Sequence, residues 1–279
     1  MKKIQKGKFS LSQAILHFII LILLFLTIYP LFIAVFISLK DIMQYKSSAW
    51  IPTFPLWTSN YVSAWKQVST YVFNTIFVSA AGTSGMIVIS SVSAYVFARL
   101  KFPGKEQIFF GIIALMMVPS VLTLIPSYML YNSMGMLNKY WVLIIPTVFG
   151  GSVGGVFLLR SFFSGIPEDI FESARLDGCT ELQACVTIAV PLSKPVIGML
   201  AIQTVISIWN DLIWPMTTIT DDKLLTISAG LFMRFTKQFN TNVPVQFAGF
   251  MVASFPLILI FIFANKFYVE GLTTAGLKL

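Results

Sequence analysis

The sequence predicts an all-α, polytopic membrane protein with six transmembrane helices. Hydrophobic residues make up 57% of its 279 residues and charged residues only 11%, whereas soluble domains carry about 25% charged residues. The mean hydropathy is +0.83. Apolar windows of membrane-spanning length recur along the chain, and they are apolar nearly all round instead of on one face. We therefore set aside a soluble globular fold.

We expect these windows to form the spans of a single transmembrane domain covering residues 1–279. About 20 helical residues are enough to cross the roughly 30 Å hydrocarbon core of a bilayer. The first window follows a basic N-terminal stretch and lacks a small-residue cleavage site, so we expect an uncleaved first span. The expected helices lie at about residues 13–39, 72–98, 107–131, 140–160, 196–215 and 245–266.

The net charge of +8 indicates a membrane partner more than a nucleic acid. Lys and Arg residues cluster at the ends of the apolar windows instead of forming one basic patch, so we expect contact with membrane lipid and not with nucleic acid. With the N-terminus inside, 12 of the 19 basic residues are cytoplasmic and 7 are outside. This bias predicts that both termini are cytoplasmic.

Aromatic, small and proline residues distinguish the first four windows and their connections. Segment 40–71 is rich in Trp and Tyr, which fit an interfacial belt or, alternatively, a ligand-stacking role. The second window holds many Ser, Gly and Ala residues that permit close helix packing. Pro119 and Pro126 predict kinks in the third window, for lining a cavity or for packing. Gly151 and Gly155 have GxxxG spacing in the fourth.

Residues that support catalysis, metal binding or nucleotide binding are sparse. Cys179 and Cys185 have only His17 as a further soft ligand, so we expect free thiols and no metal site. No glycine cluster is followed by the Lys-Ser/Thr of a phosphate loop. We therefore expect no catalytic residue and no bound cofactor in this chain, and any energy that its function uses must come from elsewhere.

A polar loop at residues 166–195 separates the fourth window from the fifth, on the cytoplasmic side of this topology. Pro167 suits the first turn of a helix, and Glu168 and Asp169 follow where acidic groups offset exposed amide dipoles. Gly178 allows the chain to turn. The loop is therefore expected to hold two short helices at an angle.

The end of the fifth window carries Trp209, Asn210 and Asp211, which we take as the candidate substrate path. An ionisable group inside a membrane is a functional candidate. Near the interface, however, the cost of charge falls, so Asp211 also suits a solvated or helix-packing role. Trp209 offers a solute an apolar face and Asn210 offers hydrogen bonds.

The loop resembles the E-A-A-x3-G-x9-I-x-L-P signature of ABC importer permeases. The stretches LLRSFFSGIPEDIFESARLDG, YNSMGMLNKYWVLIIP, IWNDLIWP and FYVEGLTTAGLKL resemble carbohydrate-importing permeases of the maltose-transporter type, so the likeness covers nearly the whole chain. Ser173 and Val190 depart from the signature by residues of similar size or polarity. The positions that correspond to the signature are Glu172, Ser173, Ala174, Gly178, Ile188, Val190 and Pro191.

The resemblance implies a type I ABC importer permease fold and a coupling helix that sits in a cleft of a separate ATPase subunit. Glu172 is then the candidate for an ion pair with that subunit, Ala174 for close packing and Gly178 for the bend. Ser173 and Asp177 complete the expected coupling site. A rigid helical knob can pass the movement of its partners to the attached spans, because packed elements move as bodies.

The resemblance also implies a set of partners in a bacterial-type cytoplasmic (inner) membrane. These are a second homologous permease, two ATP-binding subunits that hold ATP and magnesium, an extracytoplasmic solute-binding protein and a carbohydrate substrate. The outer segment 217–244 would help to meet the binding protein, and the tail from residue 266 would contact the ATPase or act as a plain anchor.

Two alternatives change the solute or the energy source. An ABC permease for a non-sugar solute would share the loop, because the loop addresses the ATPase. A secondary transporter driven by an ion gradient usually shows internal repeats and carboxylates near the midplane, and the sequence shows neither.

Overall fold

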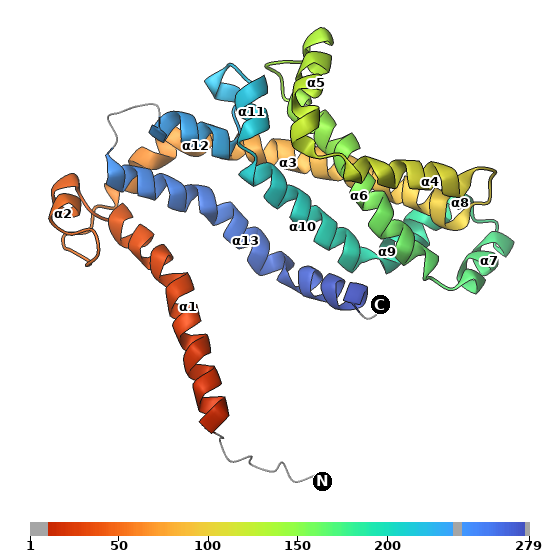
Figure 1. Cartoon of the computed structure of the whole chain (residues 1–279), viewed down its shortest axis with the longest axis horizontal. Helices are drawn as coiled ribbons and strands as arrows, with labels where there is room; N and C mark the ends of the chain where they lie inside the picture. The colour runs from red at the N-terminus through yellow and green to blue at the C-terminus, as the bar shows by residue number, and fades with distance from the viewer. Residues whose placement is uncertain (1–10, 237–241, 277–279) are drawn as a thin grey trace. The chain divides into compact units, whose positions relative to one another are not determined.

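Every element that the computed structural model describes is a helix (Figure 1). The described residues are 11–236 and 242–276. Contacts divide the chain into two compact units, residues 1–67 with 238–252 and residues 68–237 with 253–279. The helices are α1 (Leu11–Ser38), α2 (Ile42–Ser47), α3 (Ser59–Arg99), α4 (Lys105–Ala114), η1 (Leu115–Met117), α5 (Ser120–Ser133), α6 (Trp141–Ser164), α7 (Glu168–Leu176), α8 (Glu181–Ala184), η2 (Cys185–Ala189), α9 (Val190–Leu192), α10 (Lys194–Asn210), α11 (Ile213–Thr218), η3 (Asp222–Leu224), α12 (Ile227–Thr236) and α13 (Val243–Gly276).

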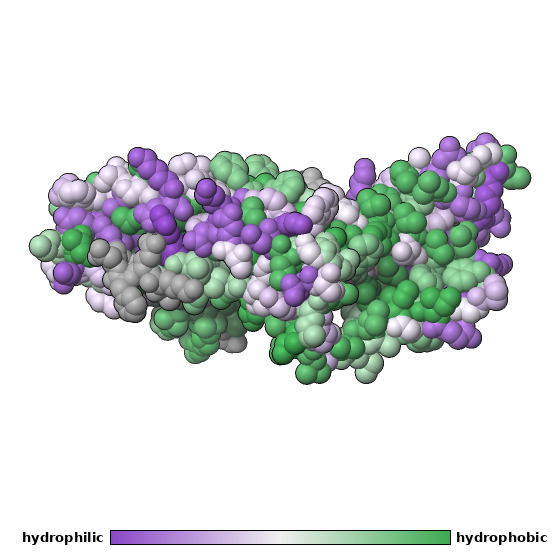
Figure 2. All heavy atoms as spheres, turned by 90° about the horizontal axis from the view of Figure 1, so that it is seen from above, coloured by the Kyte–Doolittle hydropathy of each residue, from purple (hydrophilic) through white to green (hydrophobic). Residues whose placement is uncertain are grey.

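Four helices are long and apolar enough to cross a membrane, and two bent helix pairs raise the number to as many as six within the described residues. The surface in Figure 2 accordingly carries broad apolar areas. The four long segments are Gln13–Ser38, Ser59–Arg99, Trp141–Ser164 and Val243–Ala264. The pairs are Lys105–Met117 with Ser120–Ser133, bent by 100°, and Glu181–Leu192 with Lys194–Asn210, bent by 81°.

The third and fifth expected spans are each interrupted. The third breaks at Pro119, because Val118 before it takes the extended backbone that a following proline favours, while Pro126 stays inside α5. The fifth stops at Asn210. There the carboxylate of Asp211 accepts a hydrogen bond from the backbone N–H of Trp214 at 3.2 Å and helps to start α11.

In the smaller unit, the connection after α1 folds around a buried lysine. The ammonium of Lys40 donates to the carbonyl oxygens of Ser48 and Ile51 at 2.5 and 2.6 Å. Burial lowers the pKa of this ammonium. The side-chain amide of Asn60 donates in turn to the carbonyl oxygen of Lys40 at 2.7 Å. This part of segment 40–71 is therefore an ordered loop that side-chain hydrogen bonds hold in place.

In the larger unit, glycines bring α3 and α6 into close contact. A Cβ on Gly85 of α3 would lie 2.7 Å from Cγ2 of Val148 on α6, and a Cβ on Gly155 of α6 would lie 2.7 Å from the Cβ of Ser90 on α3. No side chain fits at such distances. The close packing expected at Gly155 is therefore confirmed, and Gly85 is its counterpart on α3.

The connections around α11 and η3 are held by side-chain amides of the larger unit. Asn74 of α3 donates to the carbonyl oxygen of Lys223 at 2.7 Å. Asn138, with a φ of +56°, accepts from the backbone N–H of Asp221 at 2.8 Å. These bonds fix the segment that follows α10. Residues 237–241 of the expected outer segment lie outside the described residues.

Candidate functional site at the loop between α6 and α10

Helix α7 forms the first half of the loop and is two-faced. Pro167 precedes it and an acidic first turn follows, as the amide dipoles at a helix start favour. Phe171 is fully buried, and its ring centroid lies 6.0 Å from that of Tyr95 on α3. Leu176, by contrast, is 89% exposed. Helix α7 thus packs on α3 with one face and leaves the opposite face exposed.

Gly178 ends α7 through a pair of hydrogen bonds that needs a left-handed residue. Its φ is +83°. The N–H of Gly178 donates to the carbonyl of Arg175 at 3.0 Å and the N–H of Cys179 to that of Ala174 at 2.9 Å, which is the Schellman pattern of a helix end. Thr180 then starts α8 with a capping box. The expected bend between two short helices is therefore present at Gly178.

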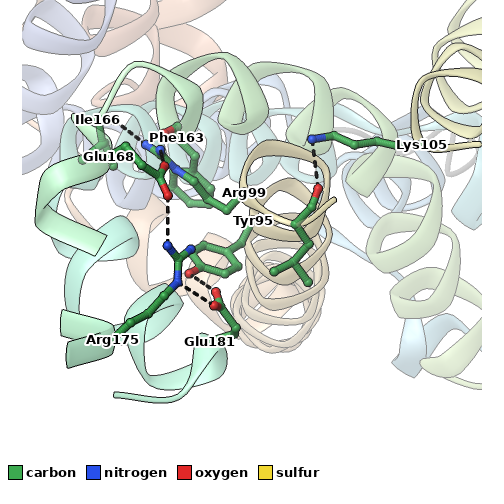
Figure 3. Close-up of polar contacts among 9 residues, drawn as sticks. Tyr95, Arg99, Lys105, Phe163, Ile166, Glu168, Arg175 and Glu181 are labelled. Atoms are coloured by element: carbon green, nitrogen blue, oxygen red, sulfur yellow. Dashed lines mark hydrogen bonds and ion pairs between the residues drawn. The ribbon is translucent and has the colours of Figure 1, made fainter. Parts of the chain in front are cut away.

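Arg99, the last residue of α3, joins the loop to the long helices (Figure 3). Its side chain is 6% exposed, and its guanidinium lies 2.6 Å from the carboxylate of Glu168. It also donates to the carbonyl oxygens of Phe163 and Ile166 near the end of α6. Its charge lies over the ring of Phe171, 4.2 Å from the centroid. One side chain therefore holds α3, α6 and α7 together.

Arg175 closes the other half of this network from the last turn of α7 (Figure 3). Its guanidinium lies 3.0 Å from Glu168 and 2.9 Å from Glu181. The hydroxyl of Tyr95 donates to Glu181 at 2.7 Å. Hydrogen bonds from Arg175, and then from Arg99, hold the pKa of Glu168 below its ordinary value. The same pairing with Glu168 raises the pKa of Arg175.

The predicted coupling residues lie outside this internal network. Glu172 and Asp177 are exposed, and their side chains make no hydrogen bond or ion pair among the residues that the structure describes. The hydroxyl of Ser173 donates to the carbonyl of Asp169 at 2.8 Å, within α7. Ala174 is half-buried. The expected coupling site therefore lies in α7 and in the turn that ends it, and the carboxylates of Glu172 and Asp177 are unpaired among the described residues.

Sequence reasoning missed Arg99, Arg175 and Glu181 as members of this site. They bind within the protein, and Arg99 lies 69 residues from its partner Glu168. The signal available in the sequence was that basic residues stand at the ends of predicted helices and acidic residues at the starts of others, all on the side expected to be cytoplasmic. Such a signal indicates a set of partners without giving the pairing.

The residues expected on a substrate path do not converge on one point. Trp209 is 4% exposed, and its indole N–H donates to the carbonyl of Ala253 at 3.2 Å, which places the ring in the helix packing. Asn210 is exposed and donates to the carbonyl of Ile206 at 2.8 Å. Asp211 contributes to the start of α11. Of the three, Asn210 offers free hydrogen-bonding capacity at a surface.

Comparison with known proteins identifies the family. Residues 86–269 match the family described as the binding-protein-dependent transport system inner membrane component. The chain belongs to this family. As a permease component it is an inner-membrane protein of a transport system that uses a solute-binding protein, and its task is transport.

Relatives and solved structures agree with this family. The probable ABC transporter permease protein YurM of Bacillus subtilis is 34% identical over 90% of this chain and 83% of its own length. The arabinooligosaccharides transport system permease protein AraQ of the same organism is 28% identical over 97% and 98%. A bacterial ABC transporter that imports alginate has a TM-score of 0.82 at 21% identity, over 94% of this chain and 100% of that one. The ABC importer permease fold is thus confirmed.

Proposed function

We propose that this permease is a translocating subunit of an ATP-driven importer for a sugar or oligosaccharide, working by alternating access. Several relatives from Bacillus subtilis are named for carbohydrates: AraQ for arabinooligosaccharides, MelC for melibiose, raffinose and stachyose, and MdxG for maltodextrin. A second solved structure shows an alginate transporter in complex with an alginate-bound periplasmic protein. These names support carbohydrate over a non-sugar solute.

The division of the loop's carboxylates into two sets carries the coupling part of this proposal. Glu168 and Glu181 are bound within the protein by Arg175. Glu172 and Asp177 are free among the described residues, close in sequence to the 89% exposed Leu176. An apolar contact with free charges at its rim suits docking into a cleft of another protein. We infer that the ATPase binds here.

The remaining subunits follow from this assignment. ATP and magnesium belong to the ATPase subunits, a second related permease completes the path, and both termini of this chain lie in the cytoplasm. The tail from residue 266 lies beside the ATPase in this arrangement. An ion-gradient mechanism is the competing function, and it needs no ATPase at all.

Co-purification followed by ATPase assays tests the proposal. The complex is purified through this permease, reconstituted with its binding protein, and assayed with maltotriose, raffinose and arabinotriose. We expect an ATPase subunit to co-purify and at least one sugar to stimulate hydrolysis. Uptake driven by a proton or sodium gradient without an ATPase would overturn the proposal.

A matched pair of variants tests the docking site itself. Leu176→Asp places a charge in the expected apolar contact and should release the ATPase from the complex. Met134→Asp is the control, because Met134 is a 59% exposed apolar residue in the turn after α5, on the expected outer side. Loss of the ATPase from both variants, or from neither, would contradict the assignment.

A further inference from the structure

One face of α10 carries polar side chains in an otherwise apolar helix. Gln203, Ser207 and Asn210 follow one another at spacings of four and three residues, which places them on a single face. All three are exposed. The side chains of Gln203 and Ser207 make no hydrogen bond among the described residues, and Asn210 keeps its side-chain carbonyl free while its NH₂ group bonds Ile206.

Lipid is a poor environment for this face. An unpaired amide or hydroxyl in hydrocarbon loses its hydrogen bonds to water and gains nothing in return. Polar residues inside membrane helices therefore face the bundle interior or a water-filled cavity. The polar face of α10 must accordingly meet water or a partner that can form hydrogen bonds.

A cavity of about 330 Å³ lies beside this face, between α3, α6 and α10. This volume falls at the lower end of the roughly 300–1,000 Å³ that is usual for small-molecule sites. Gln203 and Ser207 belong both to the polar face and to the wall of the cavity. Thr147, Gly154, Gly155 and Thr204 also line it.

Gly154 keeps part of this cavity open without being needed for helix packing. A Cβ at Gly154 would have only the Cε of Met116 nearby, at 3.9 Å, which is ordinary contact. At Gly155, by contrast, a Cβ would collide with Ser90. The two glycines therefore differ: Gly155 lets α3 approach α6, and Gly154 leaves space beside Gln203.

The wall of the cavity combines polar and apolar groups and carries no charged side chain. Gln203 can both donate and accept, and so can the hydroxyl of Ser207. The hydroxyls of Thr204 and Thr147 donate to carbonyl groups of their own helices, at 2.8 and 3.0 Å, so they are left as acceptors. A compound with many hydroxyls fits these groups. A carboxylate would lose its hydration here and meet no cation.

We propose that the face formed by Gln203, Ser207 and Asn210, with the adjoining cavity, is a hydrogen-bonding subsite of the transport path that takes one unit of an uncharged sugar. This inference rests on the proposed import function and narrows it to neutral carbohydrate. It also places the contribution of this subunit to substrate selection on α10 and α6.

Cysteine labelling tests the accessibility of this face without knowledge of the sugar. In the complete complex with Cys179→Ser and Cys185→Ser, a single cysteine is introduced as Gln203→Cys or Ser207→Cys and treated with a membrane-impermeant, water-soluble thiol reagent. Both positions should react. Ile202→Cys is the control, because Ile202 is 6% exposed and should stay unlabelled. Failure of both test positions to react would overturn the subsite.

Transport kinetics then test recognition in proteoliposomes with the sugar that stimulates the wild-type complex. Gln203→Leu and Ser207→Ala should each lower kcat/KM by about tenfold, since each removes one hydrogen bond to the sugar. Gly154→Leu should block transport by filling the cavity. Gly150→Leu, on the same helix with open space at its Cβ and no part in the cavity wall, should transport normally.

The outcomes separate this inference from the function on which it rests. A wild-type complex that moves no sugar would refute the proposed function. Wild-type transport with unchanged kcat/KM in Gln203→Leu and Ser207→Ala would refute the subsite alone. Import of an alginate trisaccharide in preference to raffinose or maltotriose would refute the choice of an uncharged sugar.

Discussion

At Gly178 the backbone adopts a φ of +83°, and no atom lies within 4 Å of the position that a Cβ would occupy. The need for glycine is therefore conformational and not steric. A β-branched residue here is disfavoured by about 1–2 kcal/mol in the left-handed region, which should unwind the end of α7. We expect Gly178→Val to uncouple sugar transport from ATP hydrolysis or to lose the ATPase, as measured on the reconstituted complex.

Asparagine at the same position separates conformation from bulk. Gly178→Asn adds a side chain that tolerates the left-handed region. It should keep most of the coupled activity that Gly178→Val loses. Equal loss in both variants would mean that bulk at the tip, and not backbone conformation, is what the ATPase excludes.

The pKa of Glu168 predicts a pH dependence for the loop. Because pairing with Arg175 and Arg99 lowers this pKa in the folded protein, the stabilisation is fully present above the ordinary carboxyl pKa of about 4.3 and is lost as pH falls through the lowered value. Glu168→Gln removes the charge at every pH. Amides of α7 should therefore exchange hydrogen about two- to fivefold faster in the variant at pH 7, since the carboxylate of Glu168 is half-exposed.

The difference between the wild type and Glu168→Gln should disappear only once the pH falls below the lowered pKa of Glu168, where the wild type gains its proton. Asp169→Asn is the matched control, because Asp169 is a neighbouring exposed carboxylate without an ion pair among the described residues. It should change exchange little at either pH. A pH-independent effect of Glu168→Gln would show that charge pairing does not hold α7.

At the scale of the helices, the contact of α3 with α6 depends on glycine. A side chain at Gly155 would meet Ser90 and Met86. Gly155→Leu should force the helices apart and destabilise the protein by about 1–3 kcal/mol, as overpacking does. Thermal unfolding in detergent should show a lower Tm, whereas Gly150→Leu, with open space at its Cβ, should leave Tm nearly unchanged.

Most helices could be predicted from apolar windows, because a span must satisfy its backbone hydrogen bonds internally. Their ends could not. The second window begins at residue 72 by hydropathy, yet α3 starts at Ser59, since polar residues continue a helix as readily outside the apolar core. Pro119 and Pro126 look alike in sequence, but only Pro119 follows a residue in extended backbone.

The candidate site was predictable where its signals are local. Pro167 and Gly178 mark the start and the end of α7 by their own backbone preferences. The pairing of Arg99 with Glu168 was not predictable, because it joins residues 69 positions apart and depends on how α3 meets α6. The polar face of α10 was visible only in part, through Asn210.

For the whole transporter, the loop and the proposed sugar face lie on one continuous stretch of chain. Helices α8, η2 and α9 lead directly into α10, with a bend of 81°. If the ATPase binds the loop as proposed, a displacement of the loop would be passed across this bend to Gln203 and Ser207 along consecutive helices. Hydrolysis and sugar release would then be linked mechanically, because packed helices move as bodies.

Arg99 sets a condition on how such permeases can be recombined. A loop grafted from a relative brings its own carboxylates, but the cation that pairs with Glu168 belongs to α3, and one of its carbonyl acceptors, Phe163, belongs to α6. The transferable module is thus the loop together with the adjoining ends of α3 and α6. A chimera that exchanges residues 166–195 alone keeps the buried guanidinium of Arg99 but removes its partner Glu168. The grafted loop is then held in place only where its own residues can pair with Arg99.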